Sequence, residues 1–472
     1  MRRFVRWGWH PVRVAPTAYA AGWLVGTGLL MLPISTQPGR TTGWWEASFT
    51  SMSALCITGL AIVDTPTHWS FFGQAVILLL IQVGGFGIMT LSTLIMVQLV
   101  GGRATLSQSL MAIGETKARS FGDLRGLPLR ILATMLVAEA CVATWLVVRF
   151  RMYTGSWGEA AWQGLFHAVS AFNNAGFSLY STNLIGFNAD PWIMIPICAA
   201  VVLGGLGFPI YIELFPRGGR RVRGSAAGRT VTTASVSELL RGAETPRRRL
   251  SVHARLTVTG TLLLLALGYA TFVAWEWTNP GTLGRTDVTG RLLGALGGAV
   301  FPRTAGFNSI DYAAATPQTI FVNYLLMFIG GGSAGTAGGV KITTVFVLLA
   351  AAWGELRGET RTTLAGRAVS VPAQRQAFTV MVLALVVVAA GVLVLLGTSG
   401  APLPQAIFEV VSAFGTVGLS MNLTPTLPPA AWATLMALMY LGRVGVLSVV
   451  TALTLQQRHR HYAYPEEDPL VG

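Results

Sequence analysis

The chain has 472 residues, of which 52% are hydrophobic and only 11% are charged, and its formal net charge is +14. A soluble domain carries charge on roughly a quarter of its residues, so this composition excludes an ordinary soluble protein. The three cysteines form no CxxC pair, which argues against a metal site and a disulfide framework; we expect Cys56, Cys141 and Cys198 to be small apolar packing residues.

Long apolar runs occur along the whole chain. A helix needs about 20 apolar residues to cross about 30 Å of hydrocarbon. Clear runs of about this length lie at residues 15–32, 127–148, 192–215, 256–275 and 378–396. We therefore predict an all-α polytopic membrane protein. The first run lacks a small-residue cleavage site, so we expect a retained span and no cleaved signal peptide.

The basic residues are confined to a few segments. Twenty-five of the 33 lie before the first run or within residues 101–130, 217–255, 357–375 and 458–460. The positive-inside rule places these segments in the cytoplasm. Both termini are then cytoplasmic, and the four stretches between them hold two spans each, which gives eight spans in the plasma membrane. The positive charge thus reflects topology and not nucleic acid, although these loops could also dock an anionic lipid surface or an acidic partner.

A glycine-containing sequence recurs four times between the predicted spans. The copies are SALCITGL, SAFNNAGF, VFPRTAGF and SAFGTVGL, starting at residues 53, 170, 300 and 412. Ser-Ala precedes the glycine at the same offset in three copies, and Leu or Phe follows it in all four. Such internal repetition predicts repeated architecture. The aligned glycines are Gly59, Gly176, Gly306 and Gly418, separated by 117, 130 and 112 residues.

A glycine-rich patch follows each of these sequences by about 24 to 28 residues. The patches are VGGFG, LGGLG, IGGGSAGTAGG and LGRVG, starting at residues 83, 203, 329 and 441. For the first two, close packing of helices is the favoured interpretation. Residues 330–339 contain six glycines, and each destabilises a helix by about 1 kcal/mol relative to Ala, so we expect a break there.

Together the markers define four units. We assign repeat 1 to residues 1–100, repeat 2 to 101–216, repeat 3 to 217–350 and repeat 4 to 351–456, followed by a cytoplasmic tail at 457–472.

Each loop follows an apolar segment that is too short to cross the bilayer. These segments span residues 44–56, 158–173, 290–301 and 403–415. A short helix before a polar loop predicts a re-entrant hairpin, and irregular backbone at membrane depth persists only in protein or beside a watery cavity. Four such hairpins around one axis would form a pore. Glycine permits the positive φ that aims carbonyls inward, four carbonyls can replace the water around K⁺, and helix C-termini favour a cation.

This organisation resembles the Trk/Ktr/HKT superfamily of potassium transporters over residues 15–456. The sequences ITGL, NAGF, RTAGF and TVGL resemble its four filter loops. GGSAGTAGGVKITT at residues 331–344 resembles its intramembrane gate loop, and GRVG at 442–445 resembles the motif that carries an arginine beneath the filter. The chain shows no extra pair of spans before the first repeat, so it is most similar to Ktr-type ion-translocating subunits. Gly59 resembles the potassium-selective members, whereas Cys56 and Ile57 match no family pattern.

The resemblance implies a set of site residues. Those of the filter, which would hold K⁺, are Ile57, Thr58, Gly59, Asn174, Ala175, Gly176, Thr304, Ala305, Gly306, Thr416, Val417 and Gly418. Those of the gate are Gly330, Gly331, Gly332, Ser333, Gly335, Thr336, Gly338, Gly339, Lys341 and Arg443. An intramembrane arginine is itself a functional-site hypothesis, and we expect Arg443 to contact carbonyls of residues 332–338.

The resemblance also implies partners: a homodimer, a cytosolic ring of nucleotide-binding regulatory subunits of the KtrA/TrkA type, and Na⁺ as a coupling or activating ion. K⁺ is the substrate, and no cofactor or catalytic residue is expected. Two alternative functions are an intramembrane enzyme and a secondary carrier of an organic solute. An enzyme would need a polar cluster at membrane depth, where only His167 lies among the histidines, and carriers usually show two inverted repeats.

Several side chains allow two interpretations. Lys341 either belongs to the gate or marks the cytoplasmic end of a helix. Arg303 either pairs with an acidic neighbour such as Glu409 or tunes the outer mouth. Asp64, Asp311 and Glu409 either concentrate cations outside the pore or are simply solvated. His167 is expected to be a packed side chain.

Overall fold

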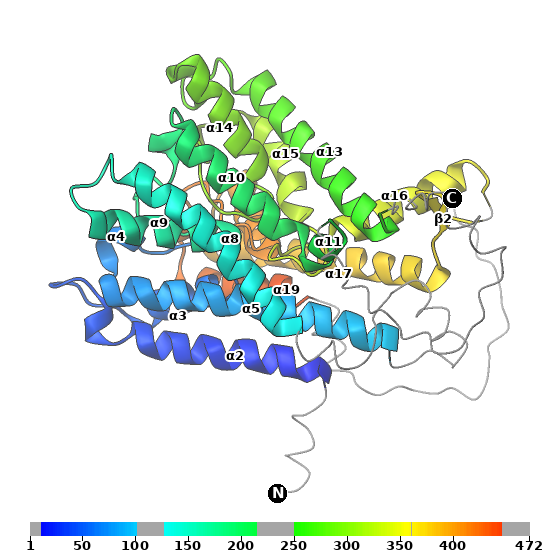
Figure 1. The fold of residues 1–472 in the computed structure, drawn as a ribbon, viewed down its shortest axis with the longest axis horizontal. Coiled ribbons are helices and arrows are strands. Elements are labelled where there is room, and N and C mark those ends of the chain that lie inside the picture. Colours follow the sequence, from blue (N-terminus) through cyan, green and yellow to red (C-terminus); the bar gives the residue numbers. More distant parts are fainter. Residues whose placement is uncertain (1–10, 102–126, 215–249, 360, 446–472) are drawn as a thin grey trace, which may run out of the picture.

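The computed structural model describes residues 11–101, 127–214, 250–359 and 361–445. Most of these residues are helical, and the helices of each repeat lie together (Figure 1). The predicted tail 457–472, and most of the basic segments 101–130 and 217–255, lie outside the described residues.

The first half of the chain forms two similar groups of helices. In each group a long helix is followed by a short helix, an irregular loop and a further helix. The first group comprises α2 (Pro11–Leu30), η1 (Pro33–Ser35), α3 (Trp44–Leu55), α4 (Thr65–His68) and α5 (Phe71–Gly101). The second comprises α8 (Leu127–Phe150), α9 (Trp157–Phe172), η2 (Ile185–Phe187), α10 (Pro191–Leu206) and α11 (Phe208–Leu214).

The second half repeats this order. The third group comprises α13 (Val252–Trp275), η3 (Leu283–Arg285), α14 (Val288–Val300), η4 (Tyr312–Ala314), α15 (Pro317–Phe328) and α16 (Ile342–Leu356). A short antiparallel hairpin of β1 (Thr363–Leu364) and β2 (Arg367–Ala368) follows, pairing Thr363 with Ala368. The fourth group comprises α17 (Val371–Ser399), α18 (Leu403–Gly415), η5 (Thr424–Thr426) and α19 (Pro429–Val444).

The long helices have a membrane-like character. Within the described part of the chain, α8, α13 and α17 are long and apolar enough to cross a bilayer. Large apolar side chains such as Leu262 on α13 and Val386 on α17 are exposed on their surfaces. In water these exposed side chains would be unfavourable, whereas hydrocarbon accommodates them.

Most residues of the short helices α3, α9, α14 and α18 are buried. Phe49, Phe166 and Phe408, which hold equivalent positions on three of them, have no exposed surface. Local signals begin two of these helices, since the Ser156 hydroxyl accepts the Glu159 N–H and the Asp287 carboxylate accepts the Gly290 N–H. The expected short segments therefore match the observed helices to within two residues at each end.

Two apolar stretches are not continuous helices. The run predicted at 192–215 is divided into α10 and α11 at Gly207, where φ is +96°. A Cβ atom on Gly207 would lie 2.6 Å from the carbonyl oxygen of Ser333, so only glycine fits beside that segment. The predicted break at residues 330–339 is present, because α15 ends at Phe328 and α16 begins at Ile342.

Candidate functional site: a ring of four backbone loops

The four repeat loops, residues 57–59, 174–176, 304–306 and 416–418, share one backbone conformation. In each, the first and third residues have positive φ and the middle residue does not. Positive φ costs a non-glycine residue free energy, and such strain persists where the surrounding structure holds it. The φ values are +49° (Ile57), +59° (Asn174), +67° (Thr304) and +48° (Thr416) at the first position, and +91°, +72°, +71° and +96° at Gly59, Gly176, Gly306 and Gly418.

The repeat loops meet in a closed ring. Each aligned glycine lies against the carbonyl oxygen of the middle residue of the next loop, and the fourth loop returns to the first. A side chain on any of these glycines would collide with that oxygen, so the contact requires glycine. A Cβ atom would lie 2.4 Å from the oxygen for Gly59 and Ala175, 2.8 Å for Gly176 and Ala305, 2.6 Å for Gly306 and Val417, and 2.0 Å for Gly418 and Thr58.

The Ser-Ala motif explains how the loops are held. In the first loop the Ser53 carbonyl accepts the Thr58 N–H at 2.8 Å, and its hydroxyl accepts the Gly59 N–H at 3.1 Å. Ser412 makes the same two bonds in the fourth loop, at 2.8 and 3.1 Å. In the second loop the Ser170 hydroxyl instead donates to the Phe177 carbonyl at 2.8 Å. The sequence showed these serines at one offset, but their role was missed.

Two hydroxyl groups beside the ring have no hydrogen-bond partner among the described residues. They belong to Thr58 and Thr416, and both side chains are fully buried. A buried hydroxyl without a partner costs free energy. These two oxygens are therefore available to a bound ion.

The glycine patches bring neighbouring helices onto the ends of the short helices. Cβ atoms on Gly84, Gly204 and Gly442 would lie within 2.0 Å of the carbonyl oxygens of Leu55, Phe172 and Phe414, respectively. Each of these carbonyls belongs to the residue four positions before an aligned glycine. The packing interpretation of the patches at 84–87 and 204–207 agrees with this geometry, and the second patch also contacts the segment that follows α15.

That segment, residues 329–341, is called here the glycine-rich loop. It closes on itself where the Gly330 N–H donates to the Val340 carbonyl at 2.8 Å. Its middle part donates to α10, from the Gly332 N–H to Gly205 at 2.9 Å and from the Thr336 N–H to Gly204 at 3.1 Å. A Cβ atom on Gly338 would lie 2.0 Å from the Thr416 hydroxyl. The glycine-rich loop therefore lies directly against the ring.

Arg443 and Lys341 both bind the glycine-rich loop. Arg443 is 3% exposed and donates to the Thr336 carbonyl and, at 3.1 Å, to the Gly84 carbonyl. The expected contact with residues 332–338 is thus present. The Lys341 ammonium group donates to the Ala337 carbonyl at 2.5 Å, and the same residue is the N-cap of α16. Lys341 thus lies at the end of α16 opposite Leu356, which leads into the predicted cytoplasmic segment 357–375, so its position agrees with the gate interpretation and not with a cytoplasmic helix end.

The interpretation of Arg303 as the partner of Glu409 is wrong. Its guanidinium group donates to the Thr261 carbonyl at 3.2 Å and to the Gly330 carbonyl at 3.1 Å, so it faces the glycine-rich loop. Glu409 is fully buried and accepts hydrogen bonds from Ser420 and Thr424. It is neither solvated nor the partner of Arg303, because the two side chains belong to different hydrogen-bond networks.

The other polar candidates all have hydrogen-bond partners in the protein. Asp64 accepts from the Ser181 hydroxyl at 2.7 Å and Asp311 from the Asn422 amide at 3.2 Å, so each carboxylate links two repeats. Their effect on cations stays a prediction. His167 is fully buried, with its ring nitrogens 2.8 Å from the Gln163 carbonyl and 3.0 Å from the Ser178 hydroxyl. It is a packed side chain, as expected.

Sequence reasoning missed one polar cluster behind the second loop. Glu139 on α8 is only 3% exposed and accepts hydrogen bonds from Asn173 at 2.8 Å and from Gln82 at 3.1 Å. Asn173 directly precedes that loop and also donates to the Gln82 side chain at 3.1 Å. The signal was available, since an acidic residue inside an apolar run is rarely without a role.

Comparison with known proteins places this architecture in a family. The family model TrkH, described as a cation transport protein, matches residues 21–461. The chain belongs to the TrkH family. It is 36% identical over 471 residues to the Ktr system potassium uptake protein B of Bacillus subtilis, covering 100% of this chain and 99% of that protein. It is 32% identical to the potassium/sodium uptake protein NtpJ of Enterococcus hirae, covering 100% and 99%.

A solved member of the TrkH family has the same fold. The crystal structure of the potassium transporter TrkH from Vibrio parahaemolyticus matches with a TM-score of 0.69 and 17% identity, covering 94% of this chain and 84% of that one. The TrkH family consists of membrane cation transporters and not of enzymes. The predictions of a membrane protein, of a cation transporter and of a chain without enzymatic activity are therefore confirmed.

Proposed function

We propose that this TrkH-family protein takes up K⁺ across the plasma membrane through the ring of repeat loops. The observation that carries the proposal is the closed ring itself, in which four loops of matched conformation bring four backbone carbonyls together. We further propose that four span–loop–span repeats, with the boundaries predicted from the sequence, cross the membrane eight times. Both termini then lie in the cytoplasm, as the basic residues indicate.

The ring supplies what a dehydrated cation needs. Carbonyl oxygens replace the water around K⁺ without adding net charge. The short helices α3, α9, α14 and α18 end at the ring, and their C-terminal ends carry partial negative charge that favours a cation. The hydroxyls of Thr58 and Thr416 offer two further oxygens. The twelve residues of the repeat loops are therefore the proposed selectivity filter, in which Gly59 favours K⁺ over Na⁺.

The glycine-rich loop is the proposed gate. It is placed against the ring by the contact between Gly338 and Thr416 and is held by Arg443 and Lys341. A positive charge below the ring raises the electrostatic barrier for a cation, and the irregular loop can change shape more easily than a helix. We propose that displacement of the loop opens the path.

The assembly is also a proposal. The similar Bacillus subtilis protein is named as part of a Ktr system and the Enterococcus hirae protein as a potassium/sodium uptake protein. The word "system" in the first name supports association with a further component, and the second name supports a role for Na⁺ as a coupling or activating ion. The resemblance to Ktr-type subunits is the ground for proposing a homodimer and a cytosolic ring of nucleotide-binding regulatory subunits.

Flux measurements on purified protein in liposomes test this function. Wild type is expected to pass K⁺ or Rb⁺ in preference to Na⁺, and Gly59→Ser is expected to reduce that preference. Gly158→Ser is a matched control, since nothing lies within 4 Å of a Cβ atom at Gly158. An inactive preparation is measured again with a regulatory ring. Absence of flux under both conditions, or unaltered selectivity in Gly59→Ser, would show that the ring is not the filter.

A further inference from the structure

Arg303 occupies a position that differs in every repeat. It lies three residues before Gly306, where the other three repeats have Cys56, Asn173 and Gly415. A cation at this position is thus found only in the third repeat, which is also the repeat whose second helix is broken by the glycine-rich loop.

The hydrogen-bond partners of Arg303 are backbone carbonyls. The residue is 7% exposed, and its two hydrogen bonds go to the carbonyls of Thr261 on α13 and of Gly330. Among the described residues no carboxylate forms an ion pair with it, and its Nε atom is buried without a partner. A buried charge without a counter-ion is costly. The hydrogen bonds to the two carbonyls are therefore the contacts that stabilise the buried guanidinium group.

Gly330 is the residue at which the glycine-rich loop closes. Its N–H donates to the Val340 carbonyl at 2.8 Å, and its carbonyl accepts from Arg303. A Cβ atom on Gly330 would lie 1.9 Å from the Gly338 carbonyl oxygen, so the two ends of the loop are in close contact. Arg303 directly precedes the strained Thr304, whose φ is +67°. Its side chain therefore joins the start of the glycine-rich loop to the third repeat loop.

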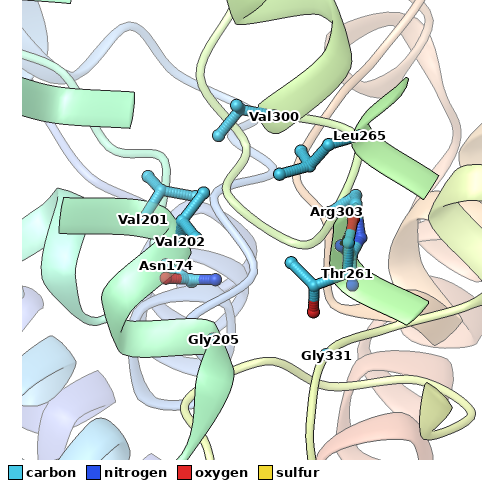
Figure 2. Close-up of a pocket in the computed structure, with 9 residues that line it drawn as sticks. All are labelled: Asn174, Val201, Val202, Gly205, Thr261, Leu265, Val300, Arg303 and Gly331. Carbon is cyan, nitrogen blue, oxygen red and sulfur yellow. Dashed lines mark hydrogen bonds between the residues drawn. The ribbon is translucent and has the colours of Figure 1, made fainter. Parts of the chain in front are cut away.

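A small pocket lies beside this contact. Figure 2 shows a pocket that Arg303, Gly331 and Asn174 line together with side chains of α10 and α13. The pocket borders the start of the glycine-rich loop on one side and the second repeat loop on the other. The pocket has room for about one water molecule, so it permits only a small shift of Gly331 or of the guanidinium group.

We propose that Arg303 is a positioning residue that couples the glycine-rich loop to the third repeat loop. The inference rests on the proposed function, in which the first is the gate and the second is part of the filter. When the gate moves, Gly330 either pulls the guanidinium group with it or releases it. The backbone of Arg303 then shifts, and with it the conformation of the adjacent Thr304. Gate position and filter selectivity then change together. If the gate and the filter were independent, each could change without the other.

Two readouts on the full-length protein in liposomes test the coupling. Gate position is measured as the labelling rate of Ser333→Cys by a charged, water-soluble thiol reagent, with the exposed Cys141 replaced by Ser. Filter geometry is measured as the K⁺/Na⁺ flux ratio. Loss of a hydrogen bond from a charged donor is worth about tenfold or more in an equilibrium. Arg303→Gln is therefore expected to speed labelling by about tenfold and to lower the flux ratio in the same variant.

Further variants separate coupling from simple damage. Arg303→Lys keeps the charge with fewer donors and is expected to fall between wild type and Arg303→Gln in both readouts. Gly330→Ala disturbs the loop from its other side and is expected to lower the flux ratio although it lies outside the ring. Arg291→Gln is the control, because Arg291 lies on α14 of the same repeat and its contacts go to the Gly284 and Thr286 carbonyls and the Trp277 ring, away from the glycine-rich loop. It is expected to change neither readout.

A change in only one readout in Arg303→Gln, or in neither, overturns the coupling. If Arg303→Gln does not yield monodisperse protein, the same criterion applies to Arg303→Lys and Gly330→Ala. Wild-type protein without selective flux contradicts the proposed function. Selective wild-type flux with uncoupled readouts contradicts this inference alone.

Discussion

The guanidinium group of Arg443 donates a hydrogen bond to the carbonyl oxygen of Thr336, 107 residues earlier in the chain. A second bond reaches Gly84 in the first repeat, at 3.1 Å. One side chain of the fourth repeat therefore joins the first repeat to the glycine-rich loop of the third.

Replacing Arg443 is expected to accelerate transport. Arg443→Gln removes the charge below the ring and weakens the hold on Thr336. A hydrogen bond from a charged donor contributes about 1.5–3 kcal/mol, so the uptake rate should rise by about tenfold or more. Initial rates of Rb⁺ uptake into liposomes provide the measurement. Arg375→Gln on the exposed start of α17 is the control. Unchanged kinetics in Arg443→Gln would refute a gating role.

The glycine patches predict a large effect on stability from a very small side chain. Gly442→Ala places a Cβ atom 1.8 Å from the Phe414 carbonyl oxygen, so α18 and α19 must separate. Overpacking of this kind costs about 1–3 kcal/mol. The thermal unfolding midpoint in detergent should fall. Gly28→Ala, which has nothing within 4 Å, should leave the midpoint unchanged or raise it. Equal midpoints for the two variants would argue against this packing.

The serines behind the ring should affect selectivity more than stability. Ser53→Ala removes the hydroxyl that accepts the Gly59 N–H at 3.1 Å. The loop then loses a bond worth about 1 kcal/mol, and the K⁺/Na⁺ flux ratio should decline several-fold. Ser412→Ala should act alike, because it removes the equivalent bond to Gly418. Thr398→Ala, whose hydroxyl bonds only within its own exposed helix end, serves as the control. A flux ratio equal to that of the control would exclude this role for the serines.

Glu139 should contribute to the stability of the second repeat. Glu139→Gln keeps the shape but places an amide donor opposite the donors of Asn173 or Gln82, so one bond is lost. Glu139→Ala removes both hydrogen bonds and leaves the Gln82 amide without an acceptor, at a cost of about 1–3 kcal/mol, while Asn173 keeps its bonds to the Gln82 side chain and the Val169 carbonyl. Thermal midpoints should therefore decrease in the order wild type, Glu139→Gln, Glu139→Ala. A Glu139→Ala midpoint equal to that of wild type would show that the cluster has no structural role.

The sequence predicts the repeated parts of this molecule better than the contacts between them. The short helices and their loops were found because four copies confirm one another, and the break at residues 330–339 because six glycines oppose a helix. The division of α10 from α11 at Gly207 was missed because its cause lies at Ser333, far away in the chain.

The same limit explains the errors at the site. Arg303 was expected to pair with an acidic neighbour such as Glu409 or to tune the outer mouth, yet backbone carbonyls hold it. Nothing in a local pattern reveals that Thr261 and Gly330 direct their carbonyls to one point. Glu139 and Gln82 lie 57 residues apart, and only the packing of α5 against α8 brings them together.

The ring has one further consequence, because a single polypeptide supplies all four of its sides. Its middle residues are Thr58, Ala175, Ala305 and Val417, which differ in size while their carbonyls serve the same contact. All four side chains are fully buried, so each corner is supported by its own local packing. A substitution in the packing behind one repeat loop therefore displaces one of the four carbonyls and makes the ring asymmetric. A ring assembled from four identical subunits would instead change on every side at once.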